Sequence, residues 1–311
     1  MKFATFVLAA LAVATPSAAQ QAPAAPAGAQ APASGGRQGA APPIDVPWND
    51  AIPAGTADQA ARALRESPRH GEWVDIKLAD GTAMKSWVTY PERSTKAGVV
   101  LVIHDINGLR DITRAVGDQL AQDGFIAIVP DFLSGKGPNG GGTESLGTGV
   151  GLAIRALTPD MVNERLNAAM AYGKSLPSSN GKTGVVGFCW GGSSSFGFIA
   201  AQPALNAGVV YYGQAPGTET NGATEESVAA QLANAKAPVL GLYAGSDMRI
   251  NSTIPVTQAA MKKLGRSYEV HVFEGAGHGF MGNQAGSGGA NLKAAQDSWP
   301  MVVEFYRKNL N

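Results

Sequence analysis

Short apolar runs rich in valine and isoleucine recur along the chain and restrict its fold class. The run at 98–103 (G-V-V-L-V-I) is typical, because no polar residue interrupts it. Strands that are buried on both faces have this pattern. Segments with helical patterns lie between most of the runs. This alternation predicts an α/β fold with a mostly parallel central sheet and helices on both faces. The predicted strands are 98–103, 125–129, 184–186, 208–212, 239–243 and 268–273, and the predicted helices are 114–122, 159–175, 193–200, 254–264 and 290–308.

Two further runs precede the parallel strands. Residues 72–79 alternate apolar with polar side chains, and a second run covers 84–90. Asp80-Gly81 between them is a hairpin signal, because glycine accepts the positive φ of tight turns. We therefore expect an N-terminal antiparallel hairpin before the parallel strands. In sheets of this kind, functional residues lie at the carboxyl ends of the strands.

The segment G-F-C-W-G at 187–191 follows one predicted strand and opens one predicted helix. It matches the G-x-nucleophile-x-G elbow, with cysteine in the place of serine. Glycines flank the nucleophile because so sharp a turn leaves no room for side chains. Cys189 is therefore the predicted nucleophile, and the amide of Trp190 beside the helix N-terminus is a predicted oxyanion donor. The alternative is a buried core thiol, which is the commoner fate of free cysteines in general.

The serines behind this cysteine do not fit the elbow. No serine in the chain has glycine both two residues before it and two residues after it. Ser193, Ser194 and Ser195 fall in the first turns of the predicted helix, where serine caps the helix or packs against it. The predicted nucleophile is therefore Cys189, the only cysteine in the chain.

A nucleophile of this kind needs a base, and folds with this elbow supply the partners in the order nucleophile, acid, histidine. Asp247 follows the predicted strand 239–243, and His278 follows the predicted strand 268–273. His278 would take the thiol proton, and Asp247 would hold the imidazole in the required tautomer. Taken alone, Asp247 would more often be a turn residue and His278 a surface loop residue. Their joint placement favours a triad.

The strand at 98–103 leads into the loop H-D-I-N-G. The loop after this strand contributes the second oxyanion amide in folds with this elbow, and Ile106 is the candidate. Asp105 stands beside it, close enough in sequence for its carboxylate to face the thiol. The other interpretation of Asp105 is a loop residue that caps the next helix, and spacing alone supports both equally.

Together these motifs resemble the dienelactone hydrolase family of α/β-hydrolases. The resemblance covers about residues 67–310 and rests on G-F-C-W-G-G, Y-A-G-S-D, E-G-A-G-H-G-F, H-D-I-N-G, Pro130-Asp131, V-Y-Y-G at 210–213 and Trp299-Pro300. It implies the α/β-hydrolase fold and a Cys-His-Asp hydrolase for a lactone or related ester, of the carboxymethylenebutenolidase type. Cys189, Asp247 and His278 match the family's triad. Trp190 and Ile106 match its oxyanion amides.

The chain departs from the family pattern at two positions. Asp105 stands where the family commonly has a glutamate that contacts the resting thiol and helps to activate it. Gly282 stands where the type enzyme has an arginine for the substrate carboxylate. The cationic candidates in nearby loops are Arg249 and Lys136, and neither matches the family motif. Tyr212, from V-Y-Y-G, is a further candidate for substrate binding.

The N-terminal residues have the pattern of a secretory signal peptide. An apolar stretch ends in Ser17-Ala18-Ala19, which places small residues directly before Gln20. The following segment is Ala, Pro, Gly and Gln with almost no large apolar side chains, which predicts a disordered linker. We expect a signal peptide at 1–19, the linker at 20–43 and one hydrolase domain at 44–311. This organisation predicts export, to a periplasm or the medium.

Charge and composition bear on the partners. The 24 basic and 24 acidic side chains cancel, so no net field draws the chain to nucleic acid or an anionic membrane. No apolar run approaches the length of a membrane span. His70, His104 and His271 lack metal-ligand spacing, so we expect no metal site and no cofactor. We expect a monomer whose partner is a small ester or lactone.

Three functions remain open at this point. The first is an exported cysteine hydrolase of the dienelactone hydrolase type. The second is a broad carboxylesterase or thioesterase with an unrelated substrate. The third is a secreted binding protein on the same scaffold that has lost its chemistry, which Asp105 and Gly282 support and the intact triad opposes.

Overall fold

The structure is a computed structural model that describes residue 1 and residues 42–219 and 222–311. Residues 2–41 hold nearly all of the predicted signal peptide and linker, so both predictions fall outside the described residues. The elements below all belong to the part of the chain from residue 42 onward.

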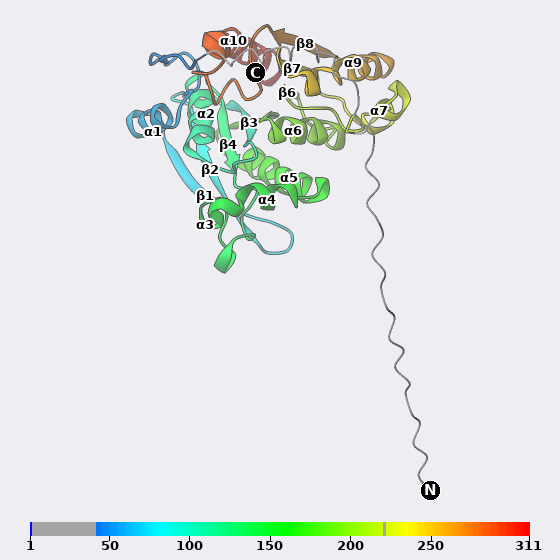
Figure 1. The fold of residues 1–311 in the computed structure, drawn as a ribbon. Coiled ribbons are helices and arrows are strands. Elements are labelled where there is room, and N and C mark those ends of the chain that lie inside the picture. Colours follow the sequence, from blue (N-terminus) through cyan, green and yellow to red (C-terminus); the bar gives the residue numbers. More distant parts are fainter. Residues whose placement is uncertain (2–41, 220–221) are drawn as a thin grey trace, which may run out of the picture. The chain divides into compact units, whose positions relative to one another are not determined.

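One eight-stranded sheet runs through this part of the chain (Figure 1), in the order β1-β2-β4-β3-β5-β6-β7-β8. Strand β2 pairs antiparallel with both β1 and β4, and all the other pairs are parallel. The sheet is therefore mostly parallel with an antiparallel N-terminal hairpin, as the sequence predicts. The strands are β1 (Gly71–Lys77), β2 (Ala83–Thr89), β3 (Ala97–Ile103), β4 (Ile126–Pro130), β5 (Ser179–Phe188), β6 (Ala207–Tyr211), β7 (Val239–Ala244) and β8 (Tyr268–Phe273).

Helices cover both faces of the sheet. The α helices are α1 (Ala57–Glu66), α2 (Asp111–Gln122), α3 (Thr143–Leu146), α4 (Val150–Arg155), α5 (Pro159–Ser175), α6 (Trp190–Ala201), α7 (Glu225–Gln231), α8 (Met248–Asn251), α9 (Ile254–Lys263) and α10 (Ala290–Leu310), with 3₁₀ turns η1 (Pro138–Gly140), η2 (Gly147–Gly149) and η3 (Ser287–Gly289). Strand β3 shows how the two cores divide. Leu101 packs in one core with residues of α5, α6, α7 and α9, whereas Val102 packs in the other with residues of α2 and α10. The continuous apolar run of β3 thus serves both faces.

The predicted elements correspond to observed ones, with two differences. Strand β8 lies at the edge of the sheet, and Val272 is 50% exposed, so the prediction that this strand is buried on both faces is wrong; Glu269 and His271 interrupt its apolar run. Helices α1, α3, α4, α7 and α8 have no counterpart among the predicted helices. The last four are only four to seven residues long, too short for a periodic pattern, whereas α1 is amphipathic and its pattern is open to prediction. The hairpin is as expected: Lys77 pairs with Ala83, and Gly81 has φ of 85°.

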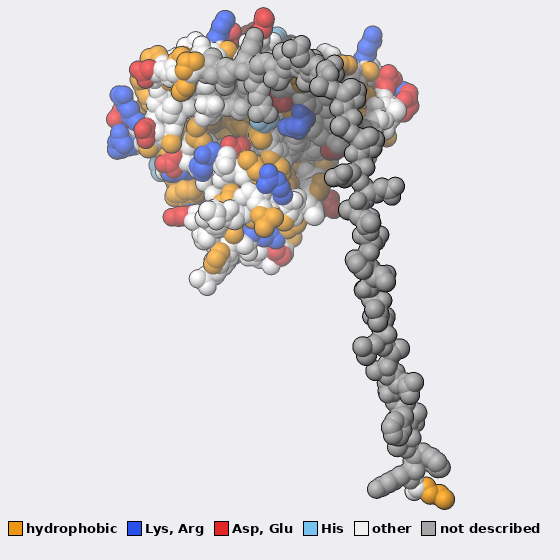
Figure 2. Space-filling view, in the orientation of Figure 1, with side chains coloured by type: hydrophobic (Ala, Val, Ile, Leu, Met, Phe, Trp, Pro, Cys, Tyr) orange, Lys and Arg blue, Asp and Glu red, His pale blue; other side chains and the backbone are white. Residues whose placement is uncertain are grey.

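The surface carries no concentration of one charge on the face drawn in Figure 2, where Lys and Arg side chains are interspersed with Asp and Glu side chains. Within the described residues, no helix is long and apolar enough to cross a membrane.

Candidate functional site

Cys189 occupies the sharp turn between β5 and α6 with an unusual backbone conformation. Its φ is 58° and its ψ is −115°, in the region that favours glycine. Strain of this kind at a non-glycine residue persists only where the surrounding structure enforces it, and it concentrates at functional sites. The Cys189 amide donates to the carbonyl of Tyr211 at 3.2 Å, which ties the turn to β6.

The glycines around this turn are needed for space. A Cβ added at Gly187 would lie 1.9 Å from the carbonyl oxygen of Gly191. A Cβ at Gly191 would lie 2.4 Å from the carbonyl oxygen of His104, and one at Gly192 would lie 2.3 Å from that of Tyr211. The turn can therefore form only where side chains are missing on both sides of the cysteine.

Two of the three serines after the turn make hydrogen bonds that tie α6 to its surroundings. Ser195 is buried and donates to the carbonyls of Gly192 and Val209, and the Ser193 hydroxyl accepts from the amide of Gln214 at 3.0 Å. Cys189 itself is the residue at the N-cap position of α6. The hydrogen bonds of Ser193 and Ser195 are those of packing residues.

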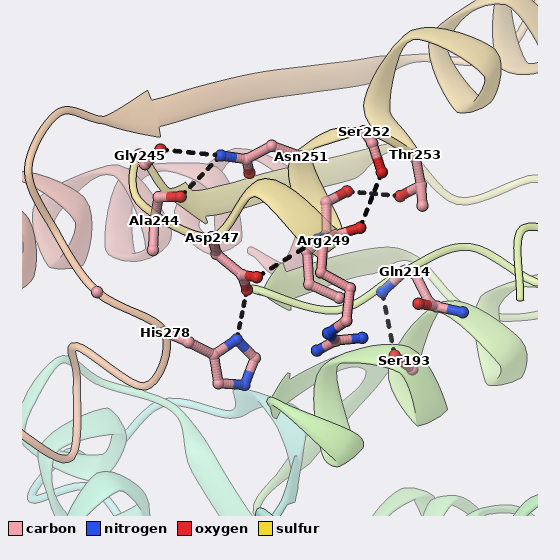
Figure 3. Close-up of polar contacts among 12 residues, drawn as sticks. Ser193, Gln214, Ala244, Gly245, Asp247, Arg249, Asn251, Ser252, Thr253 and His278 are labelled. Atoms are coloured by element: carbon pink, nitrogen blue, oxygen red, sulfur yellow. Dashed lines mark hydrogen bonds and ion pairs between the residues drawn. The ribbon is translucent and has the colours of Figure 1, made fainter. Parts of the chain in front are cut away.

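His278 and Asp247 lie in the loops after β8 and β7 and form a close pair (Figure 3). The Nδ1 atom of His278 is 2.5 Å from Oδ2 of Asp247. Because a carboxylate only accepts, Nδ1 carries the proton, and Nε2 is the ring nitrogen left for another partner. Asp247 is 9% exposed and also accepts from the amide of Ile250 at 3.4 Å. It therefore orients the imidazole and also caps the short helix α8.

The electrostatic surroundings of His278 favour its charged form. The side chain of Cys189 has the largest effect on its pKa and raises it above the usual 6.5. Partial burial opposes this shift, and the hydrogen bond that His278 donates to Asp247 adds to it. A raised imidazole pKa beside a thiol is what a thiolate–imidazolium pair requires.

Cys189 and His278 line the same pocket, a hollow of about 250 Å³ beside the elbow. Asp105 and Tyr212 line it as well. The Tyr212 ring lies 5.1 Å from the His278 ring, and its backbone has φ of 38°. Asp247 lies behind His278 and is not among the lining residues. The full set of lining residues is Ala54, Asp105, Asn107, Arg110, Ile112, Thr113, Val116, Phe188, Cys189, Tyr212, His278, Gly279, Met281, Gly282 and Asn283.

Asp105 is held in the pocket wall by two partners. One carboxylate oxygen accepts from the amide of Asn107 at 2.8 Å, and the other accepts from Arg110 at 3.1 Å. The residue at the N-cap of α2 is Arg110, so Asp105 does not cap the next helix. This geometry favours the interpretation in which its carboxylate faces the site.

The two predicted oxyanion amides have no competing acceptor. Within the described residues, neither the Trp190 amide nor the Ile106 amide donates a hydrogen bond to another protein group. Both lie next to pocket residues in the sequence, Trp190 after Cys189 and Ile106 after Asp105. Two free amides beside a nucleophile can stabilise a developing oxyanion.

Arg249 and Lys136 do not line the Cys189 pocket. Arg249 lies on α8, two residues after Asp247, and is exposed (Figure 3). Among the described residues, no group of three His, Cys, Asp or Glu side chains is placed to hold a metal ion.

The chain was also compared with known proteins. The sequence profile of the dienelactone hydrolase family matches residues 84–310. The chain belongs to the dienelactone hydrolase family.

Several relatives are recognisably similar. A Methylorubrum extorquens protein named "Putative carboxymethylenebutenolidase" is 29% identical over 237 residues, which cover 76% of this chain and 80% of that protein. A Mus musculus protein named "Carboxymethylenebutenolidase homolog" is 30% identical over 203 residues, 64% of this chain and 76% of its own. A crystal structure titled "Putative Dienelactone Hydrolase" from Klebsiella pneumoniae matches with a TM-score of 0.65 at 22% identity, over 77% of this chain and 98% of that one. This structural match shows the α/β-hydrolase fold.

Arg110 is the charged pocket residue that the sequence does not single out. Gly282 does line the pocket, at the position where the family's type enzyme has an arginine, and the cationic side chain in this wall comes instead from Arg110. The loop from Asp105 to Arg110 has no periodic pattern, so spacing gave no reason to place Arg110 beside the thiol. The five-residue separation of an acidic and a basic residue after a buried strand is the one signal that could have suggested it.

Proposed function

We propose that this chain is a hydrolase that cleaves a lactone or carboxylic ester through Cys189, His278 and Asp247. The observation that carries the proposal is that Cys189 and His278 line one pocket while His278 is bound to Asp247 at 2.5 Å. A strained cysteine at a strand–helix turn, a base and an acid that orients it are the parts of a nucleophilic acyl-transfer site.

The first half of the proposed reaction forms a thioester. His278 takes the thiol proton, and the thiolate of Cys189 attacks the ester carbonyl carbon. The carbonyl electron pair moves onto oxygen, where the amides of Trp190 and Ile106 donate to it. When the tetrahedral adduct collapses, the carbon–oxygen bond of the ester breaks, and His278 gives its proton to the leaving alkoxide.

The second half releases the acid. Water attacks the thioester carbonyl while Nε2 of His278 accepts its proton. The same two amides stabilise the second oxyanion. Collapse then breaks the carbon–sulfur bond, the carboxylic acid leaves, and the thiolate of Cys189 is restored beside the imidazolium. Asp247 keeps Nδ1 protonated throughout, so the proton always moves through Nε2.

A panel of lactones, aryl esters and thioesters tests this proposal. Wild type, Cys189→Ala and Cys189→Ser should be compared. The alanine variant should lose at least about a thousandfold in kcat, since the nucleophile is gone. The serine variant should retain little activity near neutral pH, because a hydroxyl is far less ionised than a thiol. A Cys189→Ala protein that keeps wild-type rates on every cleaved substrate would contradict the proposal.

A second candidate, a hydrolase of neutral esters or thioesters, is favoured by one feature of the pocket. Arg110 is the cationic side chain in its wall, and its charge is already paired with Asp105. Gly282 contributes no charge. We therefore infer that uncharged esters or thioesters are processed at least as well as an acidic lactone, which the relative kcat/KM values in the same panel decide. The binding-protein alternative requires that wild type and Cys189→Ala be equally inactive.

A further inference from the structure

His104, which directly follows β3, is fully buried and makes one side-chain hydrogen bond. Its Nδ1 atom lies 2.9 Å from the carbonyl oxygen of Asp105. A carbonyl only accepts, so Nδ1 carries the proton and donates. Burial lowers the pKa of this imidazole, so the ring is neutral and Nε2 is bare. Nε2 has no hydrogen-bond partner among the described residues. The ring therefore donates one hydrogen bond, from Nδ1 to the Asp105 carbonyl.

The carbonyl that accepts this bond belongs to the same peptide unit as the Ile106 amide. No peptide bond in the described residues is cis, and in a trans peptide the C=O and N–H groups point in opposite directions. Holding the carbonyl toward His104 therefore turns the Ile106 N–H away from it. The amide of Gly108 also donates to this carbonyl, at 3.2 Å. Two donors thus fix the direction of the peptide.

His104 also contacts the segment that carries the other oxyanion amide. Its ring is stacked on the Trp190 indole, with centroids 5.7 Å apart and planes 21° apart. The ring of Phe132 meets both His104 and Trp190 edge-on. The backbone of Gly191 passes so close to the His104 carbonyl that even a methyl group would not fit. One buried imidazole therefore lies between the H-D-I-N-G loop and the elbow.

We propose that His104 is a positioning residue that aims the Ile106 amide, and aligns the Trp190 segment, for an oxyanion formed at Cys189. This inference rests on the proposed hydrolase function. His104 does not touch the reacting atoms. Its role is to hold one peptide in one orientation, because the opposite orientation would place a carbonyl oxygen where the oxyanion forms.

The size of the effect follows from the two donors. Removal of one oxyanion donor typically costs about 10²- to 10³-fold in kcat. Since Gly108 still holds the carbonyl, loss of the His104 donor should cost less, about 10- to 100-fold. KM should change little, because the ground-state ester carries no oxyanion.

Two matched variants test the donor. His104→Leu removes it, and His104→Asn has a similar size but keeps an amide N–H near the place of Nδ1. Each protein is measured for ester hydrolysis, thermal unfolding and alkylation of Cys189 by iodoacetamide. In alkylation the thiolate displaces iodide at a saturated carbon, so a carbon–sulfur bond forms, a carbon–iodine bond breaks and no oxyanion appears. Cys189 is the only cysteine, so alkylation reports this thiol alone.

We expect His104→Leu to lower kcat 10- to 100-fold with alkylation within about twofold of wild type, and His104→Asn to recover most of kcat. A parallel fall in both reactions, an unchanged kcat, or no recovery in a folded asparagine variant would overturn the inference. The proposed function fails differently, through equal hydrolysis by wild type and Cys189→Ala.

A measurement on wild type covers the case in which the leucine variant does not fold. The ¹⁵N shifts of His104 should report a neutral ring protonated at Nδ1. Protonation at Nε2 would overturn the inference, since that tautomer has no proton to donate to the Asp105 carbonyl.

Discussion

At His278, the Cys189 side chain and the Asp247 carboxylate both raise the pKa of the imidazole, and partial burial lowers it. We predict that Cys189→Ala lowers this pKa most and that Asp247→Asn also lowers it. NMR titration of the His278 ring protons measures both shifts. An Asp247→Asn protein with an unchanged or higher His278 pKa would contradict the proposed pairing.

The same shift has a consequence for stability. A histidine whose pKa is raised on folding binds its proton more tightly in the folded state, so its protonation stabilises the protein fully below the unfolded pKa near 6.5. This contribution is lost as pH rises through the raised folded value. The free energy of unfolding lost in Cys189→Ala should therefore be larger at pH 5.5 than at pH 9, and urea titrations at the two pH values measure it. A loss that grows with pH would have the wrong sign.

Arg110 is the residue in the pocket wall that could select substrates by charge. Its side chain is 48% exposed and paired with Asp105, so an added ionic contact is worth about 1 kcal/mol at most. We predict that Arg110→Gln raises KM for anionic esters by no more than about fivefold and leaves KM for neutral esters unchanged. Arg249→Gln is the matched variant, exposed but outside the pocket, and should change neither. A larger effect from Arg249→Gln would restore the candidate that the sequence suggested.

At the scale of elements, the connection between β5 and α6 depends on missing side chains. We predict that Gly191→Ala destabilises the protein by about 3 kcal/mol, because its methyl group would meet the His104 backbone at 2.4 Å. Gly197→Ala on the same helix is the control. Nothing lies within 4 Å of its new methyl group, so it should stabilise by about 0.5–1 kcal/mol. Chemical denaturation compares the two, and equal effects would show that the turn is not sterically fixed.

Much of this architecture can be predicted from the sequence, and the exceptions have physical reasons. Continuous apolar runs identify buried strands such as β3, and the glycines around Cys189 identify the turn. The run at β8 differs from that of an inner strand, because Glu269 and His271 alternate with its apolar residues. This alternation is the signal of a strand with an exposed face, and the prediction of a strand buried on both faces overlooks it. The pairing of Asp105 with Arg110 depends on the path of an irregular loop, which residue patterns do not encode. The role of His104 depends on which carbonyl accepts its hydrogen bond, and only the three-dimensional structure shows that this is the carbonyl of Asp105.

At the scale of the whole molecule, the signal peptide and linker predictions concern residues outside the described part of the chain. We propose that the chain is exported and cleaved after Ala19. Expression of the full sequence in a Gram-negative host, followed by fractionation and N-terminal sequencing, should give a periplasmic protein that starts at Gln20. A cytoplasmic protein that retains residues 2–19 would contradict this proposal.

The central claim for the whole molecule is that hydrolysis passes through a thioester on Cys189. Acid quenching during turnover of an activated aryl ester, followed by intact-mass and peptide analysis, tests it most directly. We predict a mass increase equal to the acyl group, located on the peptide that contains Cys189, and no such increase in Cys189→Ala. Full turnover with the acyl group on another residue, or an undiminished rate in Cys189→Ala, would contradict the claim.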